Sequence, residues 1–217
     1  MKAMKLEWIG HACFRMTAQD GTVIITDPYD PSVGVDMLPL EADMITMSHE
    51  HHDHNETAMI VGSPLILRAD AQGEAGSVRS RALASFHDDA QGQLRGKNAI
   101  RIFEIDGLKV VHMGDQGCMP QEDILEQLAG ADVMLLPVGG TYTVDPLGAK
   151  AIIEAVKPGC VVPMHVKTAN CPYPILPVTA FLEAMGAQDA IPAAEAEIMP
   201  AHVPQGVLLM SPMADTL

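Results

Sequence analysis

The chain has 217 residues, long enough for one domain with a sizeable buried core. Its 13 basic and 28 acidic residues give a formal net charge of −15. This acidity argues against nucleic acid as a broad-surface partner, which needs clustered Lys and Arg, and against an anionic membrane surface. The sequence has no apolar stretch of signal-peptide length and no 18-residue apolar run, so the expected location is the cytoplasm. The four cysteines are far apart and form no CxxC pair, which indicates reduced thiols.

Apolar runs and turn residues predict mostly strands first and alternating helices and strands later. Strands are expected at 5–16, 22–26, 43–48, 64–68, 81–86, 99–105, 108–113, 132–138, 160–164 and 206–210. Helices are expected at 56–61, 120–128, 146–156 and 177–185. Hairpin turns are expected at Asp20-Gly21 and Asp106-Gly107, and residues 28–42 form a long loop that could make a lip over a site. This order favours an α/β layered domain.

The segment Ser48–Asn55, SHEHHDHN, holds four of the nine histidines in the chain. In an extended turn, alternate residues point the same way, so His49 and His51 can aim at one point. Asp53 and His54 would then aim at a second point nearby. Imidazole and carboxylate groups suit zinc and its divalent neighbours. A purification tag would be terminal and uniform, whereas this cluster is internal and interrupted by acids, so it predicts a metal site.

The pattern His49-x-His51-x-Asp53-His54 resembles the HxHxDH signature of the metallo-β-lactamase superfamily. The later positions of the family pattern are matched by a histidine after a strand, a Gly-Asp pair and a histidine ending a late strand: His87 in ASFHDD, Asp115 in HMGDQG and His165 in VVPMHV. The resemblance covers residues 5–166 well and the tail poorly. It implies a single domain over residues 1–217 with the four-layer αββα metallo-β-lactamase fold. The segments WIGHACF, ITDP, HMGDQG, PVGGTYTVD and VVPMH resemble a compact branch that includes L-ascorbate-6-phosphate lactonase.

The resemblance also implies a ligand map for two divalent ions, with Zn²⁺ as the default and Mn²⁺ or Fe²⁺ as alternatives. His49, His51 and His87 would hold one ion. Asp53, His54 and His165 would hold the other, and Asp115 would bridge them. Asp53 and Asp115 are therefore the residues predicted to be catalytic. Two ions about 3.5–4 Å apart can share a hydroxide that is available near neutral pH.

Other residues have two readings. His11 and Asp27 could orient ligand histidines from behind or could form a satisfied buried polar pair. Substrate contacts are possible at Thr141, Tyr142, Thr143 and Asp145, although a Gly-Gly turn and a helix cap at Asp145 would explain this segment equally well. His52, His112 and His202 are expected to be solvated, packed in a strand and on the surface, respectively. Residues 166–168 read Val-Lys-Thr where relatives often carry an aromatic residue, so the substrate-side wall differs here.

The prediction for function is hydrolysis of a small ester, lactone, amide or phosphoester by a metal-bound hydroxide. The alternative is a phosphodiesterase or nuclease of the same fold, which the acidic balance and the missing basic surface disfavour. A flavodiiron-like oxidoreductase is disfavoured because its signature has Glu at the position of His51 and because no flavin domain fits the length. A metal-binding protein without activity is disfavoured by the full ligand set. The expected partner is a small-molecule substrate, with no nucleic acid and no membrane, and a homo-oligomer is possible.

Overall fold

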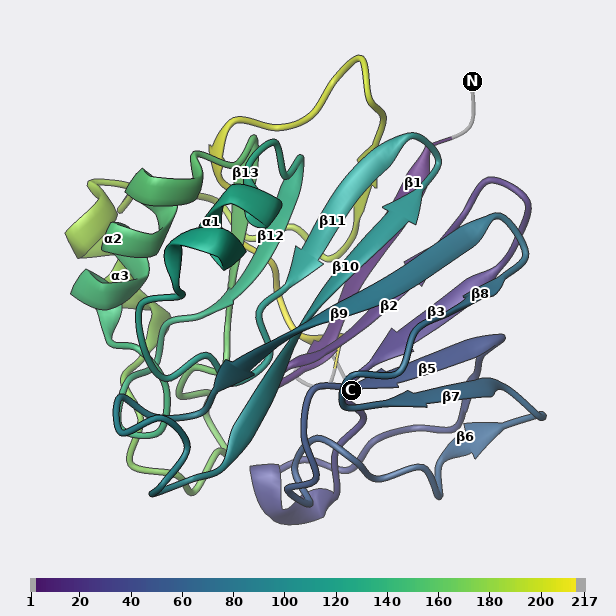
Figure 1. Cartoon of the computed structure of the whole chain (residues 1–217), viewed down its shortest axis with the longest axis horizontal. Helices are drawn as coiled ribbons and strands as arrows, with labels where there is room; N and C mark the ends of the chain where they lie inside the picture. Colours follow the sequence, from purple (N-terminus) through teal and green to yellow (C-terminus); the bar gives the residue numbers. More distant parts are fainter. Residues whose placement is uncertain (1–2, 214–217) are drawn as a thin grey trace.

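The computed structural model describes residues 3–213, and two β-sheets packed face to face form its centre (Figure 1). The first sheet has six strands in the order β14-β1-β2-β3-β5-β7. They are β1 (Met4–Gly10), β2 (Cys13–Thr17), β3 (Val23–Thr26), β5 (Met44–Met47), β7 (Leu65–Arg68) and β14 (Ala196–Ile198). The main apolar core lies between the two sheets, because side chains such as Leu6 and Phe14 of the first sheet join Ile100 and Val110 of the second in one buried cluster.

The second sheet has seven strands in the order β15-β13-β12-β11-β10-β9-β8. They are β8 (Gly73–Ala75), β9 (Val78–Phe86), β10 (Lys97–Ile105), β11 (Leu108–His112), β12 (Val133–Pro137), β13 (Cys160–Met164) and β15 (Gly206–Val207). Strands β8 to β11 pair antiparallel, and β11, β12, β13 and β15 pair parallel. The parallel strands β12 and β13 are buried along their whole length, as expected for strands covered on both faces.

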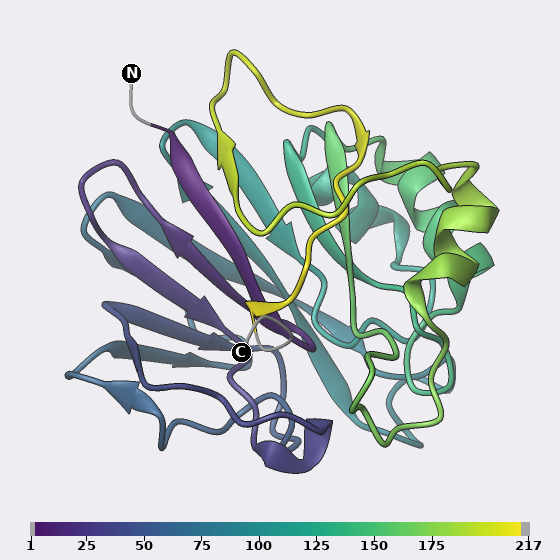
Figure 2. The same cartoon turned by 180° about the vertical axis from the view of Figure 1, so that it is seen from behind.

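The helices α1 (Glu122–Leu128), α2 (Pro146–Val156) and α3 (Val178–Met185) lie together beside the parallel strands of the second sheet, as Figures 1 and 2 show from opposite sides. Their apolar faces bury Leu128, Ile152 and Phe181 in the main core. A second, smaller core involves Ile25 of the first sheet and the loop residue Tyr29, and is completed by segments around the 3₁₀ helix η1 (Pro31–Val33) and strands β4 (Leu40–Glu41) and β6 (Ile60–Val61). Within residues 3–213, all three α-helices therefore pack against the second sheet. The loop at 28–42 contributes most of the smaller core.

Two of the expected elements were wrong. The single strand expected at 5–16 is an antiparallel pair, β1 and β2, because the chain turns at Gly10 and His11. Gly10 has φ +154°, and a Cβ there would lie 2.9 Å from the hydroxyl of Tyr29. The helix expected at 56–61 is absent: Ile60 N–H bonds to Thr57 O in a turn, and Ile60–Val61 pairs with β4. Pairing with another strand stabilises the β-branched residues Ile60 and Val61 more than an isolated short helix would.

The remaining predictions agree with the structure to within a few residues. Helix α2 has the predicted bounds, because Asp145 caps it and Pro146 stands at its first turn. Helices α1 and α3 begin two residues and one residue later than expected. The hairpin β10–β11 turns at Asp106 and Gly107, both of which have positive φ. The short strands β4, β6, β8 and β14 have too few residues to show a period in sequence. No helix within residues 3–213 combines the length and the apolar character that a membrane crossing requires.

One buried charge ties the sheets together close to the histidine cluster. Arg101 of β10 is fully buried, and its guanidinium donates to the carbonyl oxygens of Met47, Leu67 and Ala71 in the first sheet and the loop that follows it. A buried guanidinium is tolerated because it is hydrogen-bonded to these carbonyls. The carboxyl ends of β5 and β7 are thereby held against β10.

Candidate metal centre

The predicted ligands meet where strands of both sheets end. His49, His51, Asp53 and His54 follow β5, His87 follows β9, Asp115 lies three residues after β11 and His165 follows β13. Because each residue comes at the carboxyl end of its strand, the two sheets bring all seven to one edge of the sandwich. The structure thus brings together the whole ligand set proposed from the sequence; which of these residues bind metal stays a prediction.

The Asp115 carboxylate lies at the centre of the cluster. Its Oδ2 is 3.1 Å from His87 Nε2, 3.3 Å from His165 Nε2 and 3.9 Å from His49 Nε2. Its Oδ1 is 3.3 Å from His54 Nε2. One carboxylate therefore faces histidines from both halves of the predicted map, which is the geometry a bridging ligand requires.

The histidine and carboxylate atoms form three groups, each with its atoms within 4.8 Å of one another. One is His49, His51 and His87, the second is Asp53, His54 and His165 together with His11, and the third is Asp27 with His49 and His54. His11 Nε2 lies 3.3 Å from Asp53 Oδ2, so His11 stands among the ligands and not only behind them. The first two groups contain the residues that the predicted map assigns to each ion, and the third links His49 and His54 through Asp27, so the assignment of ligands to ions stays a prediction.

The donor set fits divalent metal ions. His54 Nε2 and Asp115 Oδ1 are buried and have no hydrogen-bond partner within residues 3–213. Orphaned buried polar atoms are costly unless another group satisfies them, and a cation between imidazole and carboxylate atoms would do so. Three histidines in one group, and histidines with a carboxylate in the other, are a combination that zinc, manganese and iron accept.

Asp27 supports the ligands from behind. Its Oδ2 accepts a hydrogen bond from His54 Nδ1 at 2.8 Å, and its Oδ1 accepts one from the backbone N–H of Ser48 at 2.7 Å. The Ser48 hydroxyl donates to Asp27 Oδ2 and lies 2.8 Å from His49 Nδ1. If His49 Nδ1–H donates to that hydroxyl, the Nε2 atoms of His49 and His54 are both left free to bind a metal.

Asp115 is placed by a close backbone approach. Gly114 has φ +55°, and a Cβ there would fall 2.3 Å from Asn98 Oδ1 and 2.5 Å from Ser48 Cβ. Asn98 accepts a hydrogen bond from the Asp115 backbone N–H at 3.0 Å and donates to Met113 O. Glycine is needed at 114 because the turn is left-handed and leaves no room for a side chain. Sequence reasoning missed Asn98, because the only sign of it in the sequence is one amide residue at the start of an apolar strand.

Burial and neighbouring charges set the protonation of the cluster. Burial is the largest cause that lowers the pKa of His49 to about 3 and that of His11 to about 4, with nearby histidines acting in the same direction. Burial would also lower the pKa of His54, but the carboxylates of Asp115 and Asp27 outweigh it and raise that pKa well above its usual value. The pKa of Asp115 is held well below its usual value, since His165 and His54 outweigh its burial. His49, His11 and Asp115 are thus in the forms that bind metal, neutral imidazoles and an ionised carboxylate, whereas His54 holds a proton that it would release to a bound ion.

A pocket of about 330 Å³ opens over the ligands, and it is called the histidine pocket below. It is lined by His51, His52, Asp53, His87, Arg95, Asp115, Tyr142, His165 and Tyr173. The aromatic wall comes from Tyr142 and Tyr173, whose rings meet edge to face with centroids 6.1 Å apart. Arg95 and Tyr173 were missed from the sequence, and Tyr173 supplies an aromatic ring eight positions after His165 in a chain that lacks one directly after that residue.

The predicted substrate residues separate in the structure. Tyr142 lines the histidine pocket, whereas Thr141 Oγ1 donates to Pro174 O at 2.7 Å. Asp145 accepts from Gly148 N–H as the cap of α2, and Thr143 is buried; neither lines the pocket. A substrate contact thus remains a prediction for Tyr142, while the cap explains Asp145.

The remaining histidines lie outside the ligand groups. His52 Nδ1 is 3.2 Å from Asp30 Oδ1, and 66% of the His52 side chain is exposed. His112 is buried in β11, with Nε2 2.8 Å from Ala12 O. His202 is exposed. These positions agree with the expected solvated, packed and surface histidines.

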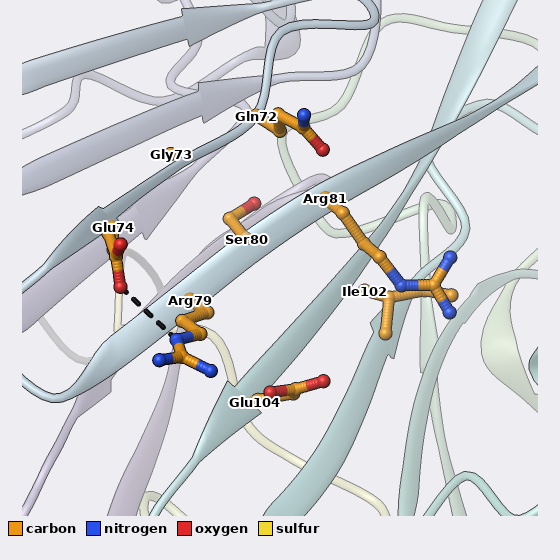
Figure 3. A pocket seen from close by; sticks show the side chains of 8 residues that line it. All are labelled: Gln72, Gly73, Glu74, Arg79, Ser80, Arg81, Ile102 and Glu104. Atoms are coloured by element: carbon orange, nitrogen blue, oxygen red, sulfur yellow. Dashed lines mark hydrogen bonds and ion pairs between the residues drawn. The ribbon is translucent and has the colours of Figure 1, made fainter.

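A second hollow of about 360 Å³ lies on β8, β9 and β10 and shares no lining residue with the histidine pocket (Figure 3). It is called the strand hollow below, and is lined by Gln72, Gly73, Glu74, Arg79, Ser80, Arg81, Ile102 and Glu104. Glu74 and Arg79 pair across it at 3.1 Å. It contains no histidine or cysteine and therefore lacks the preferred ligands of transition metals.

Comparison with known proteins agrees with this geometry. The family model described as Beta-lactamase superfamily domain matches residues 5–165. A UPF0173 protein of Pyrococcus furiosus is 32% identical over 76% of this chain and 84% of its own length. A UPF0173 metal-dependent hydrolase of Thermococcus onnurineus is 29% identical over 76% of this chain and 85% of its own. A crystal structure from Thermotoga maritima, named as a candidate Zn-dependent hydrolase of the metallo-beta-lactamase superfamily, is 31% identical, has a TM-score of 0.77 and covers 95% of this chain and 98% of its own.

The chain therefore belongs to the beta-lactamase superfamily and, within it, to the UPF0173 family of metal-dependent hydrolases. The superfamily resemblance, the metallo-β-lactamase fold and the assignment as a metal-dependent hydrolase are confirmed. The narrower resemblance to L-ascorbate-6-phosphate lactonase stays a prediction.

Proposed function

We propose that this protein hydrolyses a small ester, lactone, amide or phosphoester at a pair of divalent metal ions. The observation that carries the proposal is the convergence of four histidines on the single carboxylate of Asp115, at 3.1–3.9 Å. Divalent ions in such a site supply a nucleophile from water at neutral pH and a positive charge for the oxygen that becomes negative during hydrolysis.

The residues of the chain have separate tasks in this proposal. His49, His51 and His87 would hold one ion, Asp53, His54 and His165 would hold the other, and Asp115 faces both sets of residues. Asp27 and Ser48 fix the ring orientations of His54 and His49 through their Nδ1 atoms. His11, 3.3 Å from Asp53 Oδ2, can hold that carboxylate or join the second ion. Asp53 stands at the pocket wall, and His11 and His54 outweigh its burial and lower its pKa, so that its carboxylate is ionised as a ligand requires.

The direct test is metal content followed by turnover. Protein made in metal-replete medium should carry up to two divalent ions per chain and should hydrolyse at least one member of a panel of lactones, aryl esters and phosphodiesters. Activity should vanish on chelation and return with Zn²⁺ or Mn²⁺. Less than one tightly bound ion per chain after repletion would contradict the two-ion site. Full turnover after complete metal removal would contradict the mechanism.

A small molecule suits the pocket better than a nucleic acid. The net charge of −15 and the absence of a Lys or Arg run leave no broad surface for phosphates. We expect no retardation of RNA or DNA in a gel-shift assay at physiological salt, and only weak salt dependence for small-substrate turnover. Tight binding of either nucleic acid would favour the phosphodiesterase or nuclease alternative.

A further inference from the structure

Among residues 3–213, Arg95 is the only arginine or lysine that lines the histidine pocket, and its other lining residues are predicted ligands, the exposed His52 and two tyrosines. It also lines a neighbouring hollow of about 420 Å³ that runs behind His49 and His51. Arg95 therefore borders both hollows, as His51 does.

The position of Arg95 is fixed by its own loop. The buried carboxylate of Asp88 accepts hydrogen bonds from the backbone N–H groups of Ala90, Gly92, Leu94 and Arg95, at 2.7–3.1 Å. His87 N–H also donates to Gly96 O at 3.1 Å, which closes the loop directly beside a predicted ligand. A loop organised around one buried carboxylate loses little entropy on binding, because its backbone is already ordered.

The side chain is held as well, but not by an acid. Arg95 Nη2 donates to Thr141 O at 3.2 Å, and the guanidinium carbon lies 5.7 Å from the centroid of the Tyr142 ring. No carboxylate in the described range 3–213 lies within ion-pair distance of it. Most other exposed or half-buried arginines here do pair with an acid, as Arg15 does with Glu7 and Arg68 with Glu50. In a chain with more than twice as many acids as bases, a cation left unpaired at the pocket wall is available for a ligand.

We propose that Arg95 binds an anionic group of the substrate, a carboxylate or a phosphate, while the metal centre cleaves a bond elsewhere in the same molecule. The inference rests on the proposed hydrolase function and narrows its substrate to small molecules with a second, oxyanionic end. A planar guanidinium can donate two parallel hydrogen bonds to such a group, which a point charge on lysine cannot. Arg95 also offsets the repulsion that the acidic chain exerts on an anion.

Binding is tested first, because it does not depend on catalysis. Succinate and 3-phosphonopropionate each offer one carboxylate to the metals and a carboxylate or a phosphonate to Arg95, whereas propionate has no second end. Titration calorimetry on the zinc-loaded protein should show that Arg95→Gln weakens one or both of the two-ended probes about 10- to 100-fold, the loss of a charged hydrogen-bonding pair. Arg95→Lys should fall in between, and propionate should show no dependence on residue 95.

The control is Arg81→Gln, which removes one positive charge from an arginine that likewise has no acidic partner in the part of the chain described and bonds to Gln127. Loss confined to succinate would identify a carboxylate, and loss confined to 3-phosphonopropionate a phosphate. Equal affinities for the wild type and Arg95→Gln, or an equal loss in Arg81→Gln, would overturn the proposal.

Measurements of hydrolysis distinguish the role of Arg95 in anion binding from the proposed hydrolase function. The ratio of kcat/KM for 4-nitrophenyl hemisuccinate over 4-nitrophenyl acetate should fall about 10- to 100-fold in Arg95→Gln. An unchanged ratio would overturn the role of Arg95 even in an active enzyme. If neither ester nor any lactone is hydrolysed by metal-loaded protein while the two-ended probes still bind through Arg95, the proposed function fails and the anion site stands.

Discussion

The histidine pocket and the strand hollow have similar volumes, about 330 and 360 Å³, yet their polar groups are arranged in opposite ways. In the strand hollow, Glu74 and Arg79 neutralise each other, with 67% and 71% of their side chains exposed to water. In the histidine pocket, Asp115, His87 and His165 are buried, and each has one side-chain atom with no hydrogen-bond partner in the described residues. A hollow becomes a candidate site when unsatisfied groups converge in it, because only a ligand can then complete their bonding.

Removal of Asp115 should give the largest effect. Asp115→Ala is expected to abolish hydrolysis, since the carboxylate that faces both histidine groups is lost and the two ions are no longer held together. Loss of a group behind a ligand typically costs about 10- to 100-fold, and loss of the bridge should cost more. Turnover and metal content are measured after a thermal melt with excess metal shows that the variant folds.

His52→Ala is the matched control, because His52 lies inside the same signature but is exposed and bonds to Asp30. It should keep nearly parental turnover. Parental activity in metal-loaded Asp115→Ala would show that the ligand map is wrong. Loss of activity in His52→Ala without loss of metal would make His52 a substrate or proton-transfer residue.

Metal removal should lower stability through the histidine pocket alone. A ligand that binds only the folded state stabilises it by about 2.7 kcal/mol at one hundred times its Kd. Chelated protein should therefore melt several degrees lower than protein with Zn²⁺ added back. A chelated and a reloaded sample with the same melting temperature would mean that no tight metal site exists.

Asp27→Asn should weaken metal binding about 10- to 100-fold without removing a predicted ligand. The change keeps the size of the side chain but removes the charge that accepts hydrogen bonds from His54 and Ser48. Competition with a chromophoric chelator measures the affinity. Asp30→Asn, next to the exposed His52, serves as the control, and an equal loss in both variants would argue for a general charge effect instead of ring orientation.

The strand hollow should give the smallest effect. Glu74→Gln and Arg79→Gln are each expected to change the free energy of unfolding by no more than about 0.5 kcal/mol, because an exposed ion pair is screened by water and salt. Metal content and turnover should equal those of the parent. A drop in metal content in either variant would show that the strand hollow affects the metal site, which would contradict the contrast between the two hollows.

Much of the metal centre was predictable because its signals are local. Four of the seven predicted ligands fall within His49–His54, so one turn of chain after a strand already places them together. Asp145 and Pro146 define the start of α2 in the same local way, through a side-chain cap and a compatible φ. His87, Asp115 and His165 were found through the resemblance to the superfamily pattern, in which each follows a strand, and the ends of these strands meet at one edge.

What only the tertiary structure decided depends on contacts between distant segments. Position 10 needs glycine because Tyr29 leaves no room for a side chain at that residue, and Ile60–Val61 is a strand because Leu40–Glu41 lies beside it. Arg95 and Tyr173 reach one pocket from loops with no shared motif. The sequence by itself therefore determined the superfamily and the ligand types, since these follow from short-range order. The pocket wall around the candidate ligands was decided by packing, because residues that come together from distant segments leave no regular spacing along the chain.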